Sequence, residues 1–175
     1  SYIGTLTFSE ACIDLLFNEI FGQLKKVGAK VIVVITGHYG SCQVDCIKRI
    51  SKYYMKENPD ITIIAQPEYE GVKIDGQIPM DHAGKWETSI FWYLYPQLTY
   101  IDKFKFKSIN MKLYKNQVCD FFKTDEEWLW DEDLRITASP QLGKKCVDEI
   151  VDNIIQQIKK VLKVKKIKPH FHKKN

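Results

Sequence analysis

The amino-acid sequence predicts an α/β protein in which helices flank a mainly parallel sheet. Two short β-branched runs, Lys30–Thr36 and Ile61–Gln66, are apolar without alternation, which is typical of strands covered on both faces. The residues between them, Cys42–Glu57, carry apolar side chains at helical spacing. Strand, helix and strand in this order predict a right-handed crossover between parallel strands. Ligands bind such sheets at the carboxyl ends of the strands, so the loops after Thr36 and Gln66 are the first places to search for a site.

The segment before the first strand is predicted to be a helix. Ser9 can cap its first turn, and Gly28 supplies a stop after its last. The apolar residues between them recur every three or four positions and would form one buried face: Ile13, Leu16, Phe17, Ile20, Phe21, Leu24 and Val27.

Three further segments are expected after the second strand. Trp86–Tyr95 has the features of a short helix closed by Pro96. Lys103–Lys107 alternates as an edge strand would. Ser108–Thr137 is long and irregular, which in a compact domain suggests a lid or a subunit contact.

The last helix is predicted to begin at Ser139-Pro140, a cap followed by a first-turn proline. Its apolar residues follow at spacing four: Leu142, Cys146, Ile150, Ile154, Ile158 and Leu162. Because 175 residues are too few for two full domains, we expect one α/β domain over residues 1–165 and a basic tail over residues 166–175.

The composition excludes several classes of protein. Hydrophobic residues make up 45% of the chain, which supplies a core and argues against disorder. No apolar run approaches the roughly 18 residues of a membrane span. The net charge of +4 depends on eight lysines from Lys159 onward, so we expect neither a nucleic acid nor a membrane as partner.

The five cysteines are odd in number and scattered, which points to a reducing, cytoplasmic location. Cys42 and Cys46 are four residues apart and would share one helical face. A metal could use such a pair, although small buried thiols are the commoner reason for it.

The first candidate site is the loop TGHYGS, residues 36–41, between a strand and a helix. Neutral imidazole at His38 suits zinc, manganese or iron, and the glycines let a ligand approach the backbone. Alternatively, His38 caps the next helix or packs against Tyr39. Ser41 is expected to cap that helix, because its surroundings lack the GxSxG pattern of a nucleophilic serine.

The second candidate site is DHAGKWETS, residues 81–89, where a loop enters a helix. His82 and Glu87 could face one cavity and share a proton transfer, and Glu87 gains from the positive end of the helix. The structural alternative is that Glu87 caps the helix and His82 makes a loop hydrogen bond. Asp81 is most simply a turn residue.

Together these motifs resemble the creatininase (creatinine amidohydrolase) family in order and spacing. The matching stretches are GTLTFS at residues 4–9, VIVVITGHYGS at 31–41, DHAGKWETSIFWYLYPQLTYID at 81–102, and a last helix introduced by Ala-Ser. The resemblance implies a three-layer fold, a divalent metal (zinc, manganese or iron), and hydrolysis of a non-peptide or cyclic amide C–N bond by metal-activated water. It also implies a small-molecule amide substrate and a homo-oligomer, commonly a hexamer.

The resemblance also implies roles for four residues. His38 matches a metal-binding histidine, and Tyr39 matches a residue that creatininase turns toward its substrate. His82 matches the histidine that contacts substrate and donates a proton, and Glu87 matches the carboxylate that supports it. These are the catalytic, substrate-binding and metal-binding residues that we expect.

The chain departs from the family pattern at three places. Gly40 stands where creatininase has a metal-binding glutamate, and Ile78 stands where it has a tryptophan over the substrate. Residues 66–69 lack its second active-site tryptophan. The family's remaining ligands, a Glu-x-His pair and an aspartate, lie upstream of the Gly4-Thr5 motif, so we expect this chain to be N-terminally incomplete and to bind metal poorly by itself.

These departures leave the substrate open. A formamido-pyrimidine nucleotide and a peptide-like or sugar-derived amide are both compatible with the resemblance. From a different class, the chain could be a non-catalytic or truncated oligomerisation or binding module that keeps the fold without the metal site.

Overall fold

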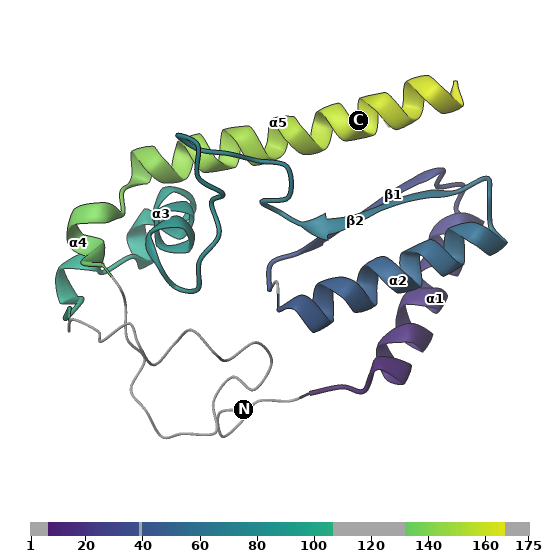
Figure 1. The fold of residues 1–175 in the computed structure, drawn as a ribbon, viewed down its shortest axis with the longest axis horizontal. Coiled ribbons are helices and arrows are strands. Elements are labelled where there is room, and N and C mark those ends of the chain that lie inside the picture. Colours follow the sequence, from purple (N-terminus) through teal and green to yellow (C-terminus); the bar gives the residue numbers. More distant parts are fainter. Residues whose placement is uncertain (1–6, 39, 107–131, 167–175) are drawn as a thin grey trace. The chain divides into compact units, whose positions relative to one another are not determined.

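The computed structural model describes residues 7–38, 40–106 and 132–166, and the chain divides into two compact units. One, the sheet unit, comprises Leu6–Glu70 and Ile154–Asn175. The other, the helical unit, comprises Ser1–Thr5 and Gly71–Asn153. Figure 1 labels the helices and strands of both. The predicted substrate contact Tyr39, residues 107–131 of the irregular segment and nearly all of the basic tail lie outside the described residues.

The sheet unit contains the predicted strand–helix–strand arrangement. In chain order its first elements are α1 (Glu10–Lys26), β1 (Val31–Thr36), α2 (Ser41–Glu57) and β2 (Thr62–Pro67). The two strands pair in parallel, with Val31 beside Thr62 and Thr36 beside Pro67. The helix and strand predictions for residues 9–67 are therefore confirmed to within two residues at each boundary.

The start and stop of α1 follow the local chemistry that the sequence indicates. Ser9 Oγ accepts a hydrogen bond of 3.2 Å from the N–H of Cys12, which satisfies one of the exposed donors of the first turn. Gly28 has a φ of 91°, a left-handed conformation that glycine adopts without steric cost. The chain can therefore turn from α1 into β1 within a few residues.

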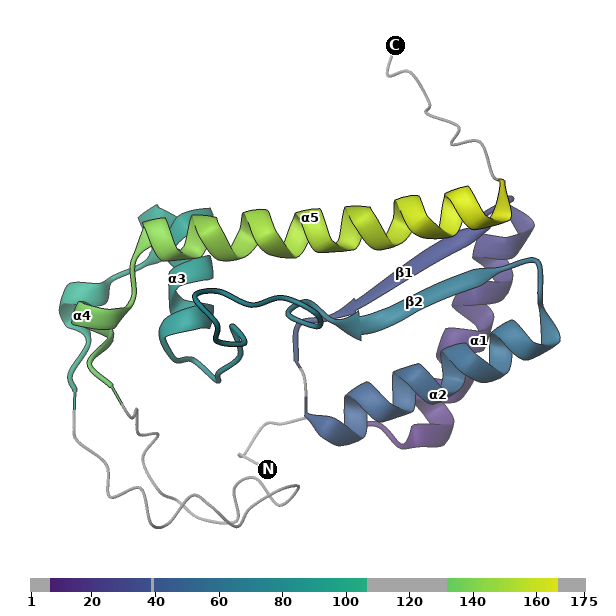
Figure 2. The same ribbon diagram turned by 45° about the horizontal axis from the view of Figure 1, so that its top comes forward.

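The core of the sheet unit lies between the strands and the two helices that both views place on one side of them (Figures 1 and 2). Phe21 is fully buried, and its ring meets that of Tyr54 edge-on at a centroid distance of 5.2 Å. The buried core residues come from α1, α2 and the two strands, with Ile61 just before β2: Phe21, Ile32, Cys46, Ile50, Ile61 and Ile63. Burying these side chains is the main source of stability for this layer.

The other face of the sheet is less covered than predicted. Figures 1 and 2 draw the last turns of α5 (Pro140–Lys165) on the opposite side of the strands from α1 and α2. Within the same unit, Ile32 is buried whereas Ile35 is 41% exposed. The expectation that β1 is buried on both faces is therefore wrong for Ile35, because the end of one helix covers less surface than two full helices.

The outer edge of β2 is partly occupied by a side chain. The N–H of Thr62 donates to the carbonyl of Lys30, toward β1, at 2.9 Å. The N–H of the next residue, Ile63, donates to the thioether sulfur of Met55 at 3.1 Å. Successive N–H groups of a strand point in opposite directions, so Met55 lies against the edge of β2 that faces away from β1.

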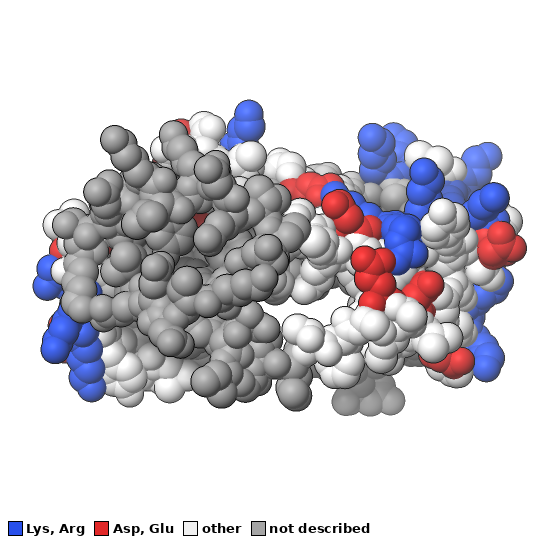
Figure 3. Space-filling model, turned by 60° about the horizontal axis from the view of Figure 1, so that its bottom comes forward, with Lys and Arg blue, Asp and Glu red and all other residues white. Residues whose placement is uncertain are grey.

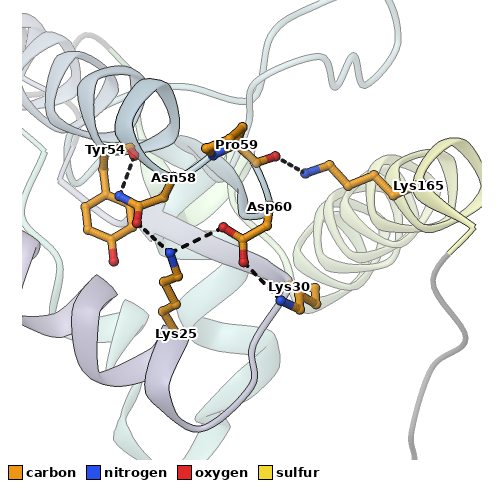
Figure 4. Close-up of polar contacts among 7 residues, drawn as sticks. All are labelled: Lys25, Lys30, Tyr54, Asn58, Pro59, Asp60 and Lys165. Atoms are coloured by element: carbon orange, nitrogen blue, oxygen red, sulfur yellow. Dashed lines mark hydrogen bonds and ion pairs between the residues drawn. The ribbon is translucent and has the colours of Figure 1, made fainter.

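A polar cluster joins the ends of several elements of the sheet unit (Figure 4). Lys25 Nζ, at the end of α1, lies 2.7 Å from Asn58 Oδ1 and 3.3 Å from Asp60 Oδ1. Lys30 Nζ lies 3.0 Å from Asp60 Oδ2. Lys165, at the end of α5, donates to the carbonyl of Pro59 at 3.2 Å. The loop between α2 and β2 is therefore fixed by three lysines from other parts of the unit.

The helical unit contains short elements and the first turns of α5. These elements are α3 (Lys85–Leu94), two single 3₁₀ turns, η1 (Pro96–Leu98) and η2 (Ile101–Lys103), and α4 (Leu134–Thr137). α5 and α3 approach closely at Gly143 and Ser89, and the N–H of Ser139 donates to Ser89 Oγ at 3.0 Å. Ser139 Oγ in turn accepts from the N–H of Leu142 at 3.1 Å, which confirms it as the predicted cap of the last helix.

Two predictions for this unit need correction. Lys103 ends η2, and residues 104–106 form no strand, so the edge strand predicted for Lys103–Lys107 is wrong over the part that the structure describes. Phe104 does have an extended backbone, with φ −64° and ψ 128°. The extended backbone at Phe104 pairs with no strand among the described residues. The segment predicted to be irregular includes the short helix α4.

The surface carries charges of both signs. In the right-hand part of Figure 3, basic and acidic side chains lie next to one another. Two of the ion pairs of α2 illustrate this mixing: Lys48 with Glu70 at 2.5 Å and Arg49 with Glu10 at 3.0 Å. Exposed pairs of this kind contribute little to stability. None of the helices in the described ranges is long and apolar enough to cross a membrane.

Candidate active site

The loop after β1 places His38 on the surface at the carboxyl end of the sheet. Its backbone carbonyl accepts a hydrogen bond of 3.1 Å from Gln43 Nε2, on the first turn of α2. Its Nε2 atom lies 3.1 Å from the point that a β-carbon on Gly40 would occupy. Glycine at position 40 therefore leaves room for the imidazole of His38, which a larger residue would push aside.

The first turn of α2 differs from the prediction. Ser41 is the first residue of α2, and the N-cap is Gly40, which has no side chain to donate or accept a hydrogen bond. The expectation that Ser41 caps the helix is therefore wrong. The first turn contains no acidic residue, so the positive end of the α2 dipole is not neutralised by a carboxylate of its own turn.

Thr36 ends β1 immediately before this loop. Its side chain is 7% exposed, and its hydroxyl has no hydrogen-bond partner among the described residues. Gln66, near the end of β2, is 5% exposed, and its Nε2 likewise has no partner in the described part of the chain. Most buried polar groups in proteins have a hydrogen-bond partner. The polar side chains at the carboxyl ends of both strands therefore lower the stability of the fold.

The second candidate site lies in the helical unit, where the loop of residues 81–84 leads into α3. The N-cap of α3 is Gly84, which offers no side-chain cap. Asp81 takes that role instead: its Oδ2 accepts from the N–H of Trp86 at 2.7 Å, and its Oδ1 accepts from the N–H of Glu87 at 3.1 Å. Asp81 is therefore more than the turn residue predicted, since both oxygens hold the first turn of α3.

Glu87 makes a return contact to the same loop. Its Oε2 accepts a hydrogen bond of 2.7 Å from the N–H of Ala83. This is the reciprocal arrangement of a capping box, shifted so that the helix carboxylate reaches the residue before the N-cap. The capping alternative for Glu87 is thus seen in the structure, and it places the carboxylate next to the backbone that follows His82.

In the sequence, His82 lies between Asp81, whose side chain caps α3, and Ala83, whose N–H is bound by Glu87. It is exposed, and the residue after it, Ala83, has a φ of 51°, a left-handed conformation that is uncommon outside glycine. Gly84 then passes so close to Asp81 that a β-carbon would lie 2.5 Å from Asp81 Oδ2. The tight turn therefore requires glycine at position 84, whether or not a ligand binds here.

The charge of Asp81 is affected by its surroundings. Burial raises the pKa of the Asp81 carboxyl above its ordinary value, and the negative charge of Glu87 adds to this, while the N–H bonds from Trp86 and Glu87 oppose it. On α5, burial raises the pKa of the fully buried Cys146 thiol to about 11, with a further contribution from the negative charge of Asp81. Asp81 is therefore a half-buried carboxylate that the local backbone keeps in place.

The predicted site residues fall in both units. His38 belongs to the sheet unit, whereas His82 and Glu87 belong to the helical unit, where a short loop brings them together. Tyr39 lies outside the described residues. Sequence reasoning missed the capping role of Asp81. Its signal was a carboxylate placed shortly before a helix whose own N-cap position is glycine.

The donor set of the described residues does not complete a metal site. Within residues 7–38, 40–106 and 132–166 there is no group of three or more histidine, cysteine, aspartate and glutamate side chains that could hold a metal ion. This includes the pair Cys42 and Cys46. A zinc ion takes three or four protein ligands, so a metal at His38 would need further ligands from outside the described part of the chain.

Solved creatininase structures share this fold. A glutamate-to-glutamine variant of creatininase complexed with creatine superposes with a TM-score of 0.69 at 19% identity, covering 91% of this chain and 68% of that chain. The Zn-Zn type of such a variant superposes with a TM-score of 0.64 at 19% identity, covering 91% of this chain and 67% of that chain. A structure of creatininase gives a TM-score of 0.61 at 19% identity, covering 90% of this chain and 66% of that chain. The chain thus spans about two thirds of the length of these proteins.

The family comparison covers nearly the whole chain. The family model described as creatininase, creatinine amidohydrolase, matches residues 1–158, which include both candidate sites and most of α5. None of the curated proteins compared with the chain matches it. The α/β fold with parallel strands agrees with the solved creatininases, as predicted. This chain is a member of the creatininase family.

Proposed function

We propose that the chain is part of a metal-dependent amidohydrolase that cleaves a non-peptide or cyclic amide C–N bond. Family membership supports this class of reaction. The single observation that carries the proposal is the loop of residues 81–87, where an exposed histidine is held between two carboxylate contacts to the backbone. Carboxylates that fix the backbone on each side of an exposed histidine are compatible with general acid catalysis by its imidazole.

In the proposed reaction, the oxygen of a water molecule adds to the amide carbonyl carbon while one proton of the water is lost to solvent, and the C–N bond then breaks. His82 donates a proton to the leaving nitrogen and regains one from the new carboxylic acid, so that the products are a carboxylate and an amine. Glu87 supports the loop that carries His82 through its bond to the Ala83 N–H. An amine is a far better leaving group than an amide anion, which is why a placed proton donor accelerates this step.

A divalent metal (zinc, manganese or iron) would polarise the carbonyl and activate the water. His38 is the one residue of the described chain that we assign to it, together with ligands from outside the described residues. One of the similar structures is a Zn-Zn type of creatininase, which supports zinc as the first metal to test. Tyr39 is proposed to contact the substrate. We also propose a cytoplasmic homo-oligomer, with the hexamer as the first state to test by light scattering.

The test combines turnover and metal content. The full-length protein that contains this chain, loaded with zinc, manganese or iron(II), is offered creatinine, creatine and a panel of cyclic and formyl amides, and released amine is measured. His82→Ala should abolish turnover and keep bound metal, whereas His38→Ala should lose metal as measured by elemental analysis. His172→Ala, beyond the residues that the family model matches, is the matched control and should change neither.

Gly40, which stands where creatininase has a metal-binding glutamate, supports a second candidate function, a non-catalytic or truncated binding or oligomerisation module. Such a module would bind no stoichiometric metal and hydrolyse none of the amides, while remaining folded and associated. That combination of results would replace the hydrolase proposal. Turnover that is unchanged by both histidine substitutions would instead show that the site has been assigned to the wrong residues.

A further inference from the structure

Two carboxylates close the loop that presents His82, and one of them, Asp81, was assigned to no step of the reaction proposed above. Asp81 accepts hydrogen bonds from the N–H groups of Trp86 and Glu87, at 2.7 and 3.1 Å. Glu87 returns a bond of 2.7 Å to the N–H of Ala83. The backbone on each side of His82 is therefore tied to the first turn of α3, once from the residue before it and once at the residue after it.

The fit around Asp81 is close. A β-carbon on Gly84 would lie 2.5 Å from Asp81 Oδ2 and 2.7 Å from its Cγ, well inside any allowed contact. Ala83 is held at a φ of 51°, a left-handed conformation that is unfavourable for any residue with a β-carbon. Such strained backbone persists only where its surroundings determine it, and here the determining contacts are those of Asp81 and Glu87.

The surroundings of the Asp81 carboxyl also bear on its role. The carboxyl of Asp81 is half-buried. Burial raises its pKa, as does the negative charge of Glu87, while the N–H bonds from Trp86 and Glu87 oppose this. A serine or asparagine side chain offers one acceptor oxygen, so neither could meet the two N–H groups with a separate oxygen for each, as Asp81 does.

We propose that Asp81 is a positioning residue of the active site, which holds the backbone around His82 so that its imidazole is presented in one orientation. The inference rests on the proposed function, in which His82 protonates the leaving nitrogen. Asp81 acts through the loop and contacts neither substrate nor the proton that is transferred. Its two oxygens fix two successive N–H groups of α3, a geometry that only a two-acceptor side chain provides in full.

The test compares Asp81→Ala, Asp81→Asn and the matched control Asp133→Asn. Asp133 also caps a helix of the same unit, since its side chain accepts from the N–H of Arg135 at 3.0 Å, and it belongs to α4 rather than to the His82 loop. The ¹⁵N signals of the His82 imidazole are recorded as a function of pH in the whole chain. They report the tautomer and the titration of His82 without any substrate.

Asp81→Ala should change the tautomer balance or the titration midpoint of His82, and Asp81→Asn, which keeps one acceptor oxygen, should restore the wild-type signals in part. With a hydrolysed amide in hand, Asp81→Ala should lower kcat by about 10- to 100-fold with little change in KM, as expected for a misplaced proton donor. Asp133→Asn should leave the His82 signals and kcat unchanged.

The proposal is overturned if Asp81→Ala or Asp81→Asn lowers the free energy of unfolding while the His82 signals and their pH dependence stay those of the wild type. Asp81 would then be a helix cap only. If Asp81→Ala does not fold, Asp81→Asn decides the question alone. Failure of the full-length wild-type protein to hydrolyse any amide would count against the proposed function, whereas the imidazole signals would still show whether Asp81 orients His82.

Discussion

The carbonyl oxygen of Ser89, on α3, lies 1.9 Å from the point that a β-carbon on Gly143 of α5 would occupy. The β-carbon of Tyr93 lies 2.9 Å from the same point. A backbone atom cannot move aside as a flexible side chain can. The two helices therefore approach to a distance that only glycine at position 143 permits.

Gly143→Ala should destabilise the helical unit by about 1–3 kcal/mol, because the added methyl group forces the two helices apart. The measurement is the free energy of unfolding from urea titration. Gly22→Ala is the matched control, since Gly22 lies within α1 with nothing within 4 Å of the added carbon. It should stabilise the protein by up to about 1 kcal/mol through helix propensity. Equal effects of the two substitutions would refute the close approach.

Removing two buried hydroxyl groups should have opposite consequences. Thr36→Val removes an oxygen that has no partner among the described residues, so the free energy of unfolding should stay the same or rise by about 1 kcal/mol. Ser89→Ala removes the acceptor of the Ser139 N–H and should cost about 1–3 kcal/mol. Both are measured by denaturant unfolding. A large loss of stability in Thr36→Val would mean that the hydroxyl is satisfied by a bound group.

The stability contributed by Asp60 should depend on pH in a defined direction. The hydrogen bond from Lys30 lowers the pKa of the Asp60 carboxyl below its ordinary value, and Lys25 contributes in the same sense (Figure 4). The folded state therefore favours the ionised form. This contribution is present above the unfolded-state pKa of roughly 4 and is lost as the pH falls through the lower folded-state pKa.

Asp60→Asn should accordingly be less stable than the wild type at pH 7, with a difference that shrinks as the pH falls below roughly 4. Because Asp60 is exposed, the difference should also shrink in high salt. Thermal unfolding at several pH values and two salt concentrations measures both trends. A difference that grows toward low pH would mean that folding raises the pKa of Asp60 instead of lowering it.

The cysteines should differ in reactivity. Burial raises the pKa of the Cys146 thiol to about 11, so almost none of it is thiolate at neutral pH, and the residue is fully buried. Cys12 and Cys42 are exposed. Alkylation followed by peptide mass spectrometry should label Cys12 and Cys42 in the native protein and Cys146 only after denaturation. Rapid native labelling of Cys146 would show that α5 opens away from α3.

Sequence patterns predicted most of the fold because the decisive interactions are local. Ser9 and Gly28 bound α1 through contacts within one turn, and the β-branched runs gave both strands. Alternation failed for Lys103–Lys107, because Lys103 ends a 3₁₀ turn and an alternating pattern cannot report whether a partner strand exists. The degree of cover over Ile35 depends on packing between distant segments, which the pattern of one strand does not contain.

The candidate site was predictable in part for the same reason. His38 was correctly expected at the end of β1, and the nearness of Glu87 to the His82 loop follows from a spacing of a few residues. The capping role of Asp81 had only a weak signal, a carboxylate shortly before an N-cap glycine, because the role depends on the left-handed turn at Ala83, which no preference of alanine suggests.

The contact between Met55 and Ile63 bears on the direction in which the sheet can grow. The N–H groups of Ile63 and Ala65 point away from β1, and position 67 is proline, which has none. Met55 already occupies the first of these donors. An added strand needs a row of donors and acceptors, and the outer edge of β2 offers an interrupted one. A further strand, from this chain or from another, is therefore better accommodated beside β1, at the edge that faces away from β2.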